Sequence, residues 1–305
     1  MMIKTCSITI TFNPDLPVLE KQISALSNQV SKLVIVDNGS KNINEIADVS
    51  QKYDVELIVL GENLGIAEAQ NTGIKCAIQD ECSHVILFDH DSLIQSDFVA
   101  GLLNTEQYGI QSGLKVAAVG PNFNDPRTNS NYSPLVKKWC RLLNGFILNR
   151  YDFSKCSTPF IQPYFLIASG CLININHLKD IGFMRSDFFI DAVDSEWSFR
   201  AVSKGYSILM STSVSMTHTV GDDRKQIFGR QFSIHSNFRR YFNLRNNIYL
   251  LGLGYFSWTE RIRMLTLLGV RSIIGFFYSD DKFQYVSYFF KSVHHGFTKK
   301  LGPLK

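Results

Sequence analysis

The spacing of apolar residues predicts alternating strands and helices over the first part of the chain. Short apolar runs predict strands at residues 5–12, 33–36, 55–60 and 85–88. Apolar residues that recur every three or four positions predict helices at residues 16–26, 43–51 and 66–78. Buried strands separated by helices are typical of a parallel sheet that is covered on both faces. We therefore predict an α/β fold for this region.

The rest of the chain has a different pattern. Residues 122–160 are poorly periodic, which predicts loops. A strand or strand pair bent around Gly170 is expected at 164–175, then a helix at 193–204 and short strands at 208–210 and 214–217. Further helices are expected at 232–253, 257–278 and 283–297. This predicts an α/β domain at residues 1–225 and a helical region at 226–305.

Polar residues gather where three of the predicted strands end. These clusters cover residues 9–13, 37–40 and 89–91. In open α/β sheets, ligands bind outside the carboxyl ends of the strands. We therefore expect the three clusters to lie at one binding site.

The pair Asp89 and Asp91 is the sharpest chemical feature of the sequence. Two carboxylates one residue apart, just past a buried strand, can bind one hard cation such as Mg²⁺ or Mn²⁺ together with substrate phosphates. The alternative is a turn with two solvated carboxylates. A position at the end of a central strand favours the metal site, because a charge buried there needs a partner.

A second acidic group lies at the start of the helix predicted at 193–204. Asp194 and Glu196 occupy its first turn, and Asp191 precedes it. Carboxylates in a first turn often only complement the helix dipole. The functional alternative is a general base that takes a proton from an acceptor hydroxyl. The dipole lowers the pKa of such a base, whereas neighbouring carboxylates raise it, and the sequence leaves the outcome open.

His218 follows the strand predicted at 214–217. A single histidine is more often structural than a ligand. It becomes relevant to the metal only if the fold brings it to Asp91, since imidazole is compatible with Mn²⁺.

In their order along the chain, these motifs resemble those of the family 2 glycosyltransferases with the GT-A fold. The motifs are Thr9-Ile-Thr-Phe-Asn13, Val36-Asp37-Asn38-Gly39-Ser40, Asn63-Leu-Gly65-Ile-Ala67, Asn71-Thr-Gly73, Asp89-His-Asp91, Ser169-Gly170 and Asp194-x-Glu196-Trp197-x-x-Arg200. Within that family the chain most resembles bacterial rhamnosyltransferases of O-antigen and other surface-polysaccharide pathways. The resemblance implies an inverting, metal-dependent transfer from a nucleoside diphosphate sugar, with dTDP-rhamnose as the donor and a lipid-linked saccharide as the acceptor.

The resemblance also implies roles for individual residues. It places the nucleotide and donor sugar on Thr9, Thr11, Asn13, Asp37, Asn63, Gly65, Asn71 and Asp89. It places Mg²⁺ or Mn²⁺ on Asp91, Asp89 and His218. It places the acceptor on Glu196, Trp197 and Gly170, and the catalytic acids at Asp194, Asp191 and Glu196. Asp194 matches the second acid of the family's Glu-Asp pair, but Val193 stands where the first acid usually is, so the base is left between Asp194 and Asp191.

Charge is distributed unevenly along the chain. Residues 220–305 hold 14 Lys and Arg against 5 Asp and Glu, whereas residues 1–219 hold 17 against 22. A basic segment implies an anionic partner. Helices with basic and aromatic residues suit a membrane interface, which would place the protein in the cytoplasm, at the inner face of the cytoplasmic membrane. The alternative is a helical subdomain whose arginines are merely solvated.

Composition narrows the remaining alternatives. With 45% hydrophobic residues and 12% aromatic residues, the chain is neither disordered nor of low complexity. Its 6 cysteines contain no CxxC pair, so a disulfide framework or a zinc site is not expected. Residues 9–14 lack the glycine and basic residues of a nucleotidyltransferase loop, which argues against that enzyme class. Nucleic-acid binding stays an alternative because of the basic segment, although the chain carries no helix-turn-helix or zinc-finger pattern.

Overall fold

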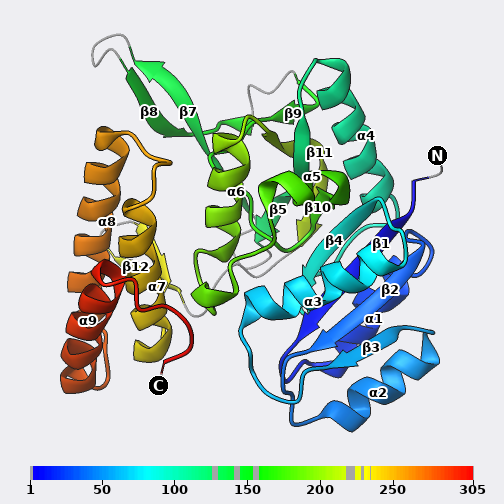
Figure 1. Cartoon of the computed structure of the whole chain (residues 1–305), viewed down its shortest axis with the longest axis horizontal. Helices are drawn as coiled ribbons and strands as arrows, with labels where there is room; N and C mark the ends of the chain where they lie inside the picture. Colours follow the sequence, from blue (N-terminus) through cyan, green and yellow to red (C-terminus); the bar gives the residue numbers. More distant parts are fainter. Residues whose placement is uncertain are drawn as a thin grey trace.

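One large mixed sheet forms the centre of the protein (Figure 1). The structure is a computed structural model that describes residues 3–125, 130–140, 145–153, 158–217, 224–227, 230–233 and 235–304. Its main sheet has the strand order β3-β2-β1-β4-β10-β5-β11-β9, and the short β6 pairs with β5. The strands are β1 (Thr5–Thr11), β2 (Lys32–Asp37), β3 (Glu56–Val59), β4 (His84–Asp89), β5 (Val116–Asp125), β6 (Ser130–Asn131), β9 (Phe160–Ile161), β10 (Cys171–Asn174) and β11 (Ser207–Thr217). The predicted α/β class, mostly parallel with helices around the sheet, is confirmed.

The first four strands run parallel, because helices connect them. β1 lies between β2 and β4 and is parallel to both, and β2 is parallel to β3. The connecting helices are α1 (Leu16–Leu26), α2 (Ile43–Lys52) and α3 (Ile66–Gln79). Every residue of β1 is buried, as expected for a strand covered on both faces. These elements match the predicted ones to within one or two residues at each end.

β10 interrupts the parallel order, since it runs antiparallel to both β4 and β5. β11 is in turn parallel to β5. α4 (Phe98–Gln111) precedes β5, α5 (Ile175–Ile181) follows β10, and α6 (Val193–Ser203) precedes β11. The carboxyl ends of β1, β2, β4 and β11 therefore open toward the same edge of the sheet, which brings the polar clusters of the sequence together.

Four predictions about elements need correction. Residues 122–160 are not only loop, because β7 (Leu135–Cys140) and β8 (Gly145–Arg150) form an antiparallel hairpin. Residues 164–175 contain one strand, β10, and only from residue 171 on. The strands expected at 208–210 and 214–217 are one strand, β11, whose polar middle lies at a register shift where Ser211 Oγ accepts the Val214 N–H at 3.2 Å. The helix expected from 232 begins at Asn237, after a short hairpin of β12 (Arg224–Ile227) and β13 (Arg230–Ser233).

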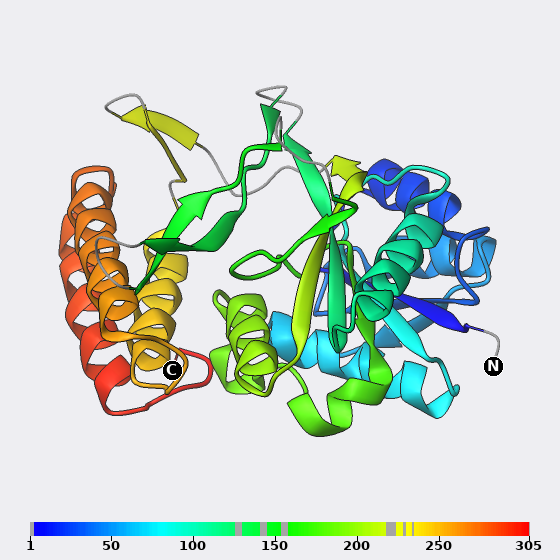
Figure 2. The same ribbon diagram turned by 90° about the horizontal axis from the view of Figure 1, so that it is seen from above.

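Three helices close the chain: α7 (Asn237–Leu251), α8 (Trp258–Phe277) and α9 (Lys282–Phe297). They stand together at the end of the molecule opposite β1–β3, and the β7–β8 hairpin reaches toward them (Figure 2). Lys137 of β7 pairs with Glu260 of α8 at 2.9 Å. Among the described residues, no helix combines the length and the apolar character needed to cross a bilayer. The division of the chain at residues 225 and 226 stays a prediction.

Gly73 marks the closest approach of α3 to the sheet. A Cβ at this position would lie 2.3 Å from Ile8 Cγ2, and Ile8 is fully buried in β1. We expect Gly73→Ala to destabilise the protein by about 1–2 kcal/mol, because overpacking outweighs the gain in helix propensity. The matched control is Gly269→Ala on the exposed side of α8, where no atom lies within 4 Å. That variant should gain up to about 1 kcal/mol. Urea denaturation measures both, and equal effects of the two substitutions would contradict this packing.

Candidate active site

The loop after β4 carries Asp89 and Asp91, and a buried glutamine fixes its backbone. Gln22 Nε2 donates to the carbonyl oxygens of Asp89 (2.7 Å) and Ser92 (2.9 Å). Gln22 Oε1 accepts from Thr9 Oγ1 at 3.0 Å. Thr9 and Gln22 are fully buried, so Thr9 supports this loop from within the core. The sequence analysis missed Gln22, whose only signal was a polar residue on the apolar face of a predicted helix.

A second link joins the same loop to the segment before β10. Ser169 Oγ lies 2.7 Å from Ser92 Oγ and accepts the Asp89 N–H at 3.1 Å. The Gly170 N–H donates to Leu87 O at 2.7 Å. Gly170 has a φ of +75°, and a Cβ there would lie 2.9 Å from Met216 Sδ. The Ser169-Gly170 motif therefore packs directly beside Asp89.

The end of β11 reaches this loop as well. Leu93 and Thr217 form an antiparallel bridge in which each N–H donates to the other's carbonyl at 3.2 Å. His218, the predicted metal ligand, is the next residue and lies outside the described residues. Thr217, the residue before His218, is thus paired with Leu93, which follows Asp91 by two residues.

Asp37 lies at the end of β2 and is bound from within the protein. Its Oδ1 accepts from Thr11 Oγ1 at 2.9 Å, and its Oδ2 accepts the N–H groups of Gly39 (3.1 Å) and Ser40 (2.9 Å). A carboxylate offers about four lone pairs, so capacity for one further donor is left. Asn13, with a φ of +49°, binds the same turn through the Lys41 N–H at 2.9 Å.

Asn63 and Gly65 shape the loop before α3. Asn63 Oδ1 accepts from Asn38 Nδ2 at 3.2 Å and from the Gly65 N–H at 3.0 Å. Gly65 has a φ of +89°, and a Cβ there would lie 2.5 Å from the carbonyl oxygen of Phe189. The Ile66 N–H donates to that same oxygen at 2.8 Å. Gly65 is thus required for close contact with the segment before α6.

Asn71 of α3 joins the same two segments. Its Nδ2 donates to Met184 O at 2.9 Å, and its Oδ1 accepts the Met184 N–H at 2.9 Å. The side chain also donates to Ser186 Oγ at 3.0 Å and is 4% exposed. The structure therefore uses the Asn71 amide to hold the chain that leads to Asp191 and Asp194.

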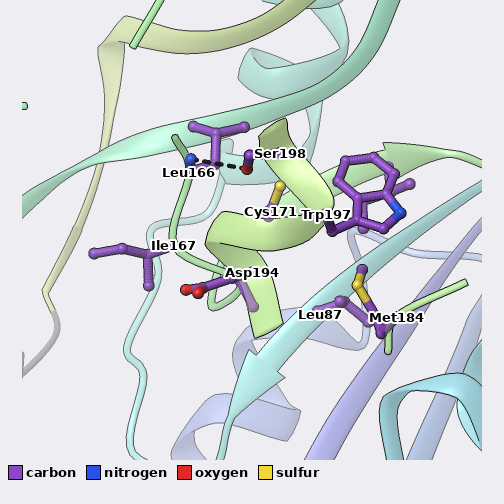
Figure 3. Close-up of a pocket in the computed structure, with 10 residues that line it drawn as sticks. Leu87, Leu166, Ile167, Cys171, Met184, Asp194, Trp197 and Ser198 are labelled. Atoms are coloured by element: carbon purple, nitrogen blue, oxygen red, sulfur yellow. Dashed lines mark hydrogen bonds between the residues drawn. The ribbon is translucent and has the colours of Figure 1, made fainter. Parts of the chain in front are cut away.

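Asp194 lies in the first turn of α6, beside the segment that carries Leu166 and Ile167 (Figure 3). It lines a mainly apolar pocket together with Leu87, Leu166, Ile167, Ala168, Cys171, Ile173, Met184, Trp197 and Ser198. Burial raises the pKa of the Asp194 carboxyl to about 6. Hydrogen bonds from the N–H groups of Ser195 and Ala168 lower this pKa, and the charges of Asp191 and Asp89 raise it. Burial therefore outweighs the hydrogen bonds that lower the pKa of Asp194, and the charges of Asp89 and Asp191 act on this carboxyl.

The other acids of this segment have different surroundings. Asp191 has a φ of +64°, and its Oδ1 accepts a hydrogen bond from Arg239 Nε at 3.4 Å. Glu196 is 1% exposed, accepts from Arg200 Nε (3.0 Å) and Nη2 (2.8 Å), and accepts from Tyr255 Oη at 3.1 Å. Trp197 is 2% exposed and donates its indole N–H to Gly182 O at 2.9 Å. The structure thus brings Asp191 and Asp194 toward Asp89, whereas Glu196 and Trp197 hold α6 in place.

A further acidic group lies away from this edge. Glu56, Cys76 and Asp80 form a group of three described residues whose ligand atoms lie within 4.8 Å of one another, a spacing that could suit a metal. Both carboxylates of the group form ion pairs with Lys32 at the start of β2. The ammonium group supplies the positive charge there, so we do not regard this group as the metal centre.

Comparisons with known proteins define the class. The family described as "Glycosyl transferase family 2" matches residues 6–107. The chain is 30% identical over 282 residues to the dTDP-rhamnosyl transferase RfbF of Shigella flexneri, covering 92% of this chain and 90% of that protein. The chain therefore belongs to glycosyltransferase family 2, and the protein is a glycosyltransferase. The nucleotidyltransferase and nucleic-acid-binding alternatives are set aside.

Solved structures agree on the fold. The structure of GalNAc-T7 with UDP, GalNAc and Mn²⁺ superposes with a TM-score of 0.59 at 12% identity and covers 88% of this chain. The structure of Staphylococcus aureus TarS residues 1–349 superposes with a TM-score of 0.57 at 15% identity, covering 97% of this chain and 88% of that one. The chain spans 55% of the GalNAc-T7 chain. These likenesses confirm the predicted GT-A fold.

The raised pKa of Asp194 makes stability depend on pH. The folded protein binds more protons than the unfolded chain between the ordinary pKa near 3.8 and about 6, so folding becomes less favourable as pH rises through this range. Asp194→Asn removes this titration. We expect the variant to gain about 1–3 kcal/mol over the wild type between pH 4 and pH 7. Urea denaturation at both pH values in a chelating buffer measures it, and a constant difference between the two proteins would show that Asp194 is not buried as described.

Proposed function

We propose that this glycosyltransferase moves rhamnose from dTDP-rhamnose to a hydroxyl of a lipid-linked saccharide, with inversion at the anomeric carbon. The observation that carries the proposal is that Asp194 lines a pocket with Leu87, two residues before Asp89, and that the charges of Asp89 and Asp191 act on its carboxyl. The name of the Shigella relative supports the choice of donor.

Asp194 serves as the general base in this proposal. A carboxylate with a pKa of about 6 is ionised at neutral pH and is still basic enough to take a proton from a hydroxyl in the transition state. Such a group contributes on the order of 10²–10⁴-fold to the rate. Asp191, which Arg239 contacts, raises the pKa of Asp194 through its charge, so we assign it to tuning the base. A single displacement by the activated hydroxyl inverts the sugar.

The donor set at the end of β4 fits a hard cation. Asp89 and Asp91 offer carboxylate oxygens, which Mg²⁺ and Mn²⁺ prefer, and His218 is the candidate third ligand on the segment beyond the Leu93–Thr217 bridge. A bound divalent ion would stabilise the negative charge that develops on the leaving diphosphate. Mn²⁺ accompanies UDP in the GalNAc-T7 structure.

The nucleotide occupies the ends of β1 and β2 in this proposal. The Asp37 carboxylate keeps capacity for one more hydrogen-bond donor and would accept an N–H of the nucleobase. Asn13 and Asn63 flank it through the turns that they stabilise, while Thr9, Thr11 and Asn71 hold this surface from within. Gly170 lies beside Asp89, where the acceptor would enter, and Glu196 and Trp197 support the helix that carries the base.

Loss of either key acid tests the function. We expect Asp194→Asn and Asp91→Ala each to reduce transfer from dTDP-rhamnose by at least about 10²-fold, with the fold intact. In the wild type, kcat should fall as the pH drops below about 6, because Asp194 becomes protonated. The control is Asp97→Asn, an exposed acid a few residues past Asp91, which should keep full activity. Product formation by the Asp194→Asn variant at the wild-type rate would overturn the assignment of the base.

We further propose that α8 and α9 bind an anionic membrane surface. Large apolar side chains are exposed along α8 with helical spacing, among them Trp258 (71%), Ile273 (62%) and Phe277 (69%). On α9, Phe283 is 90% exposed and Phe290 is 66% exposed. Apolar surface of this extent is typical of an interaction site, and basic residues in the same region favour anionic lipid. A lipid-linked acceptor would be reached most directly from such a surface.

Liposome flotation tests the membrane proposal. We expect the protein to float with anionic liposomes at low salt and to float less with neutral ones, because charge attracts it before the apolar residues insert. The double variant Phe283→Ser/Phe290→Ser should reduce flotation several-fold. Tyr108→Ser on α4, also an exposed aromatic, is the control. Equal flotation with both kinds of liposome would count against anionic lipid, and a concentration-dependent dimer lost in the double variant would assign the surface to a second copy of the chain.

A further inference from the structure

The segment between Phe188 and α6 has an unusual backbone. Phe189, Asp191 and Ala192 have φ values of +65°, +64° and +61°, although none is glycine. Phe189 has a ψ of −67°, and the Ile190 N–H donates to Phe188 O at 2.8 Å. This is the rare form of the γ-turn, and backbone of this kind costs on the order of 1–3 kcal/mol per residue. The surrounding structure must therefore hold it.

One side chain of α7 supplies most of the restraint. Asn246 Nδ2 donates to the carbonyl oxygens of Phe188 (3.0 Å), Ile190 (2.8 Å) and Asp191 (2.9 Å). The Asn246 side chain is fully buried, so its amide forms these bonds out of contact with water. A single amide thus contacts three carbonyl oxygens of one strained turn.

Arg245 orients that amide. Its Nε donates to Asn246 Oδ1 at 2.9 Å, and its Nη2 donates to Phe188 O at 3.1 Å. Its Nη1 donates to Gly302 O at 2.5 Å, and the Gly302 N–H donates to Asp187 O at 2.6 Å. The guanidinium group lies 4.8 Å from the ring centroid of Phe242, whose ring stacks on Phe189. Arg245 is 1% exposed, and its hydrogen bonds stabilise this turn.

This turn connects the proposed nucleotide surface with the helix that carries the proposed base. Phe189 O accepts the Ile66 N–H at 2.8 Å, directly after Gly65 of the proposed nucleotide surface. Asp191 lies in this turn, and Asp194 lies in the first turn of α6, which begins at Val193 directly after it. A shift of the turn would therefore move the proposed base relative to the donor.

We propose that Arg245 and Asn246 are positioning residues for catalysis, which hold the turn at 188–192 so that Asp191 and Asp194 face the donor. This inference rests on the proposed role of Asp194. It makes α7, beyond the region that the family description matches, part of the catalytic machinery.

The test compares two neighbouring asparagines. Asn246→Ala removes the amide, whereas Asn247→Ala removes a side chain that donates to Asn243 O within its own helix at 2.8 Å. We expect Asn246→Ala to lower kcat by about 10–100-fold, because misplacement of a reacting group by about 1 Å costs that much. The donor KM should change less than about threefold, and the acidic midpoint of the kcat–pH profile should shift as Asp191 moves relative to Asp194. Asn247→Ala should behave like the wild type in all three measurements.

A second readout does not depend on activity. Hydrogen exchange of the Ile66 and Ile190 amides should accelerate in Asn246→Ala and remain unchanged in Asn247→Ala. If Asn246→Ala does not fold, Arg245→Lys, which keeps the charge but loses the bond to Asn246 Oδ1, is judged by the same criteria. Unchanged exchange at both amides, or a loss of activity carried by KM alone, would overturn the proposal. Absence of rhamnosyl transfer by the wild type would refute the proposed function instead, and exchange would still decide whether the turn is held as described.

Discussion

The site depends on holding several carboxylates close together against their mutual repulsion. Burial is the main cause that raises the pKa of Asp194, and the charges of Asp191 and Asp89 raise it further. Such an arrangement persists only if the backbone around each acid is fixed more firmly than the repulsion can displace it. The fold meets this requirement with buried polar side chains that bind the backbone of these segments.

Each acidic segment has its own support of this kind. Gln22 and Ser169 bind the loop of Asp89, while Asn71 binds the chain around Met184. Asn246 binds the turn before α6. Every one of these side chains is nearly or fully buried, so each bond is made where an unsatisfied group would be costly. The candidate site is thus built from elements that are distant in sequence and are joined by four buried polar side chains.

Much of the fold could be predicted from the sequence, because periodic apolar positions report burial directly. The strands around Asp37 and Asp89 and the helices α8 and α9 are found where periodicity placed them. The β7–β8 hairpin escaped prediction because apolar and polar residues do not alternate regularly along its two strands. The sequence singled out the acids of the candidate site. It did not show that Glu196 binds Arg200 and Tyr255, because those bonds depend on side-chain geometry, which sequence spacing does not reveal. Gln22 was missed for a related reason, since a bond from a side chain to distant backbone leaves no sequence pattern.

The Leu93–Thr217 bridge has a consequence for how such enzymes diverge. Both of its hydrogen bonds run between main-chain atoms, so the register of β11 beside the Asp91 loop does not depend on which side chains occupy the two positions. Substitutions of Leu93 or Thr217 that keep both main-chain groups can therefore leave the bridge intact.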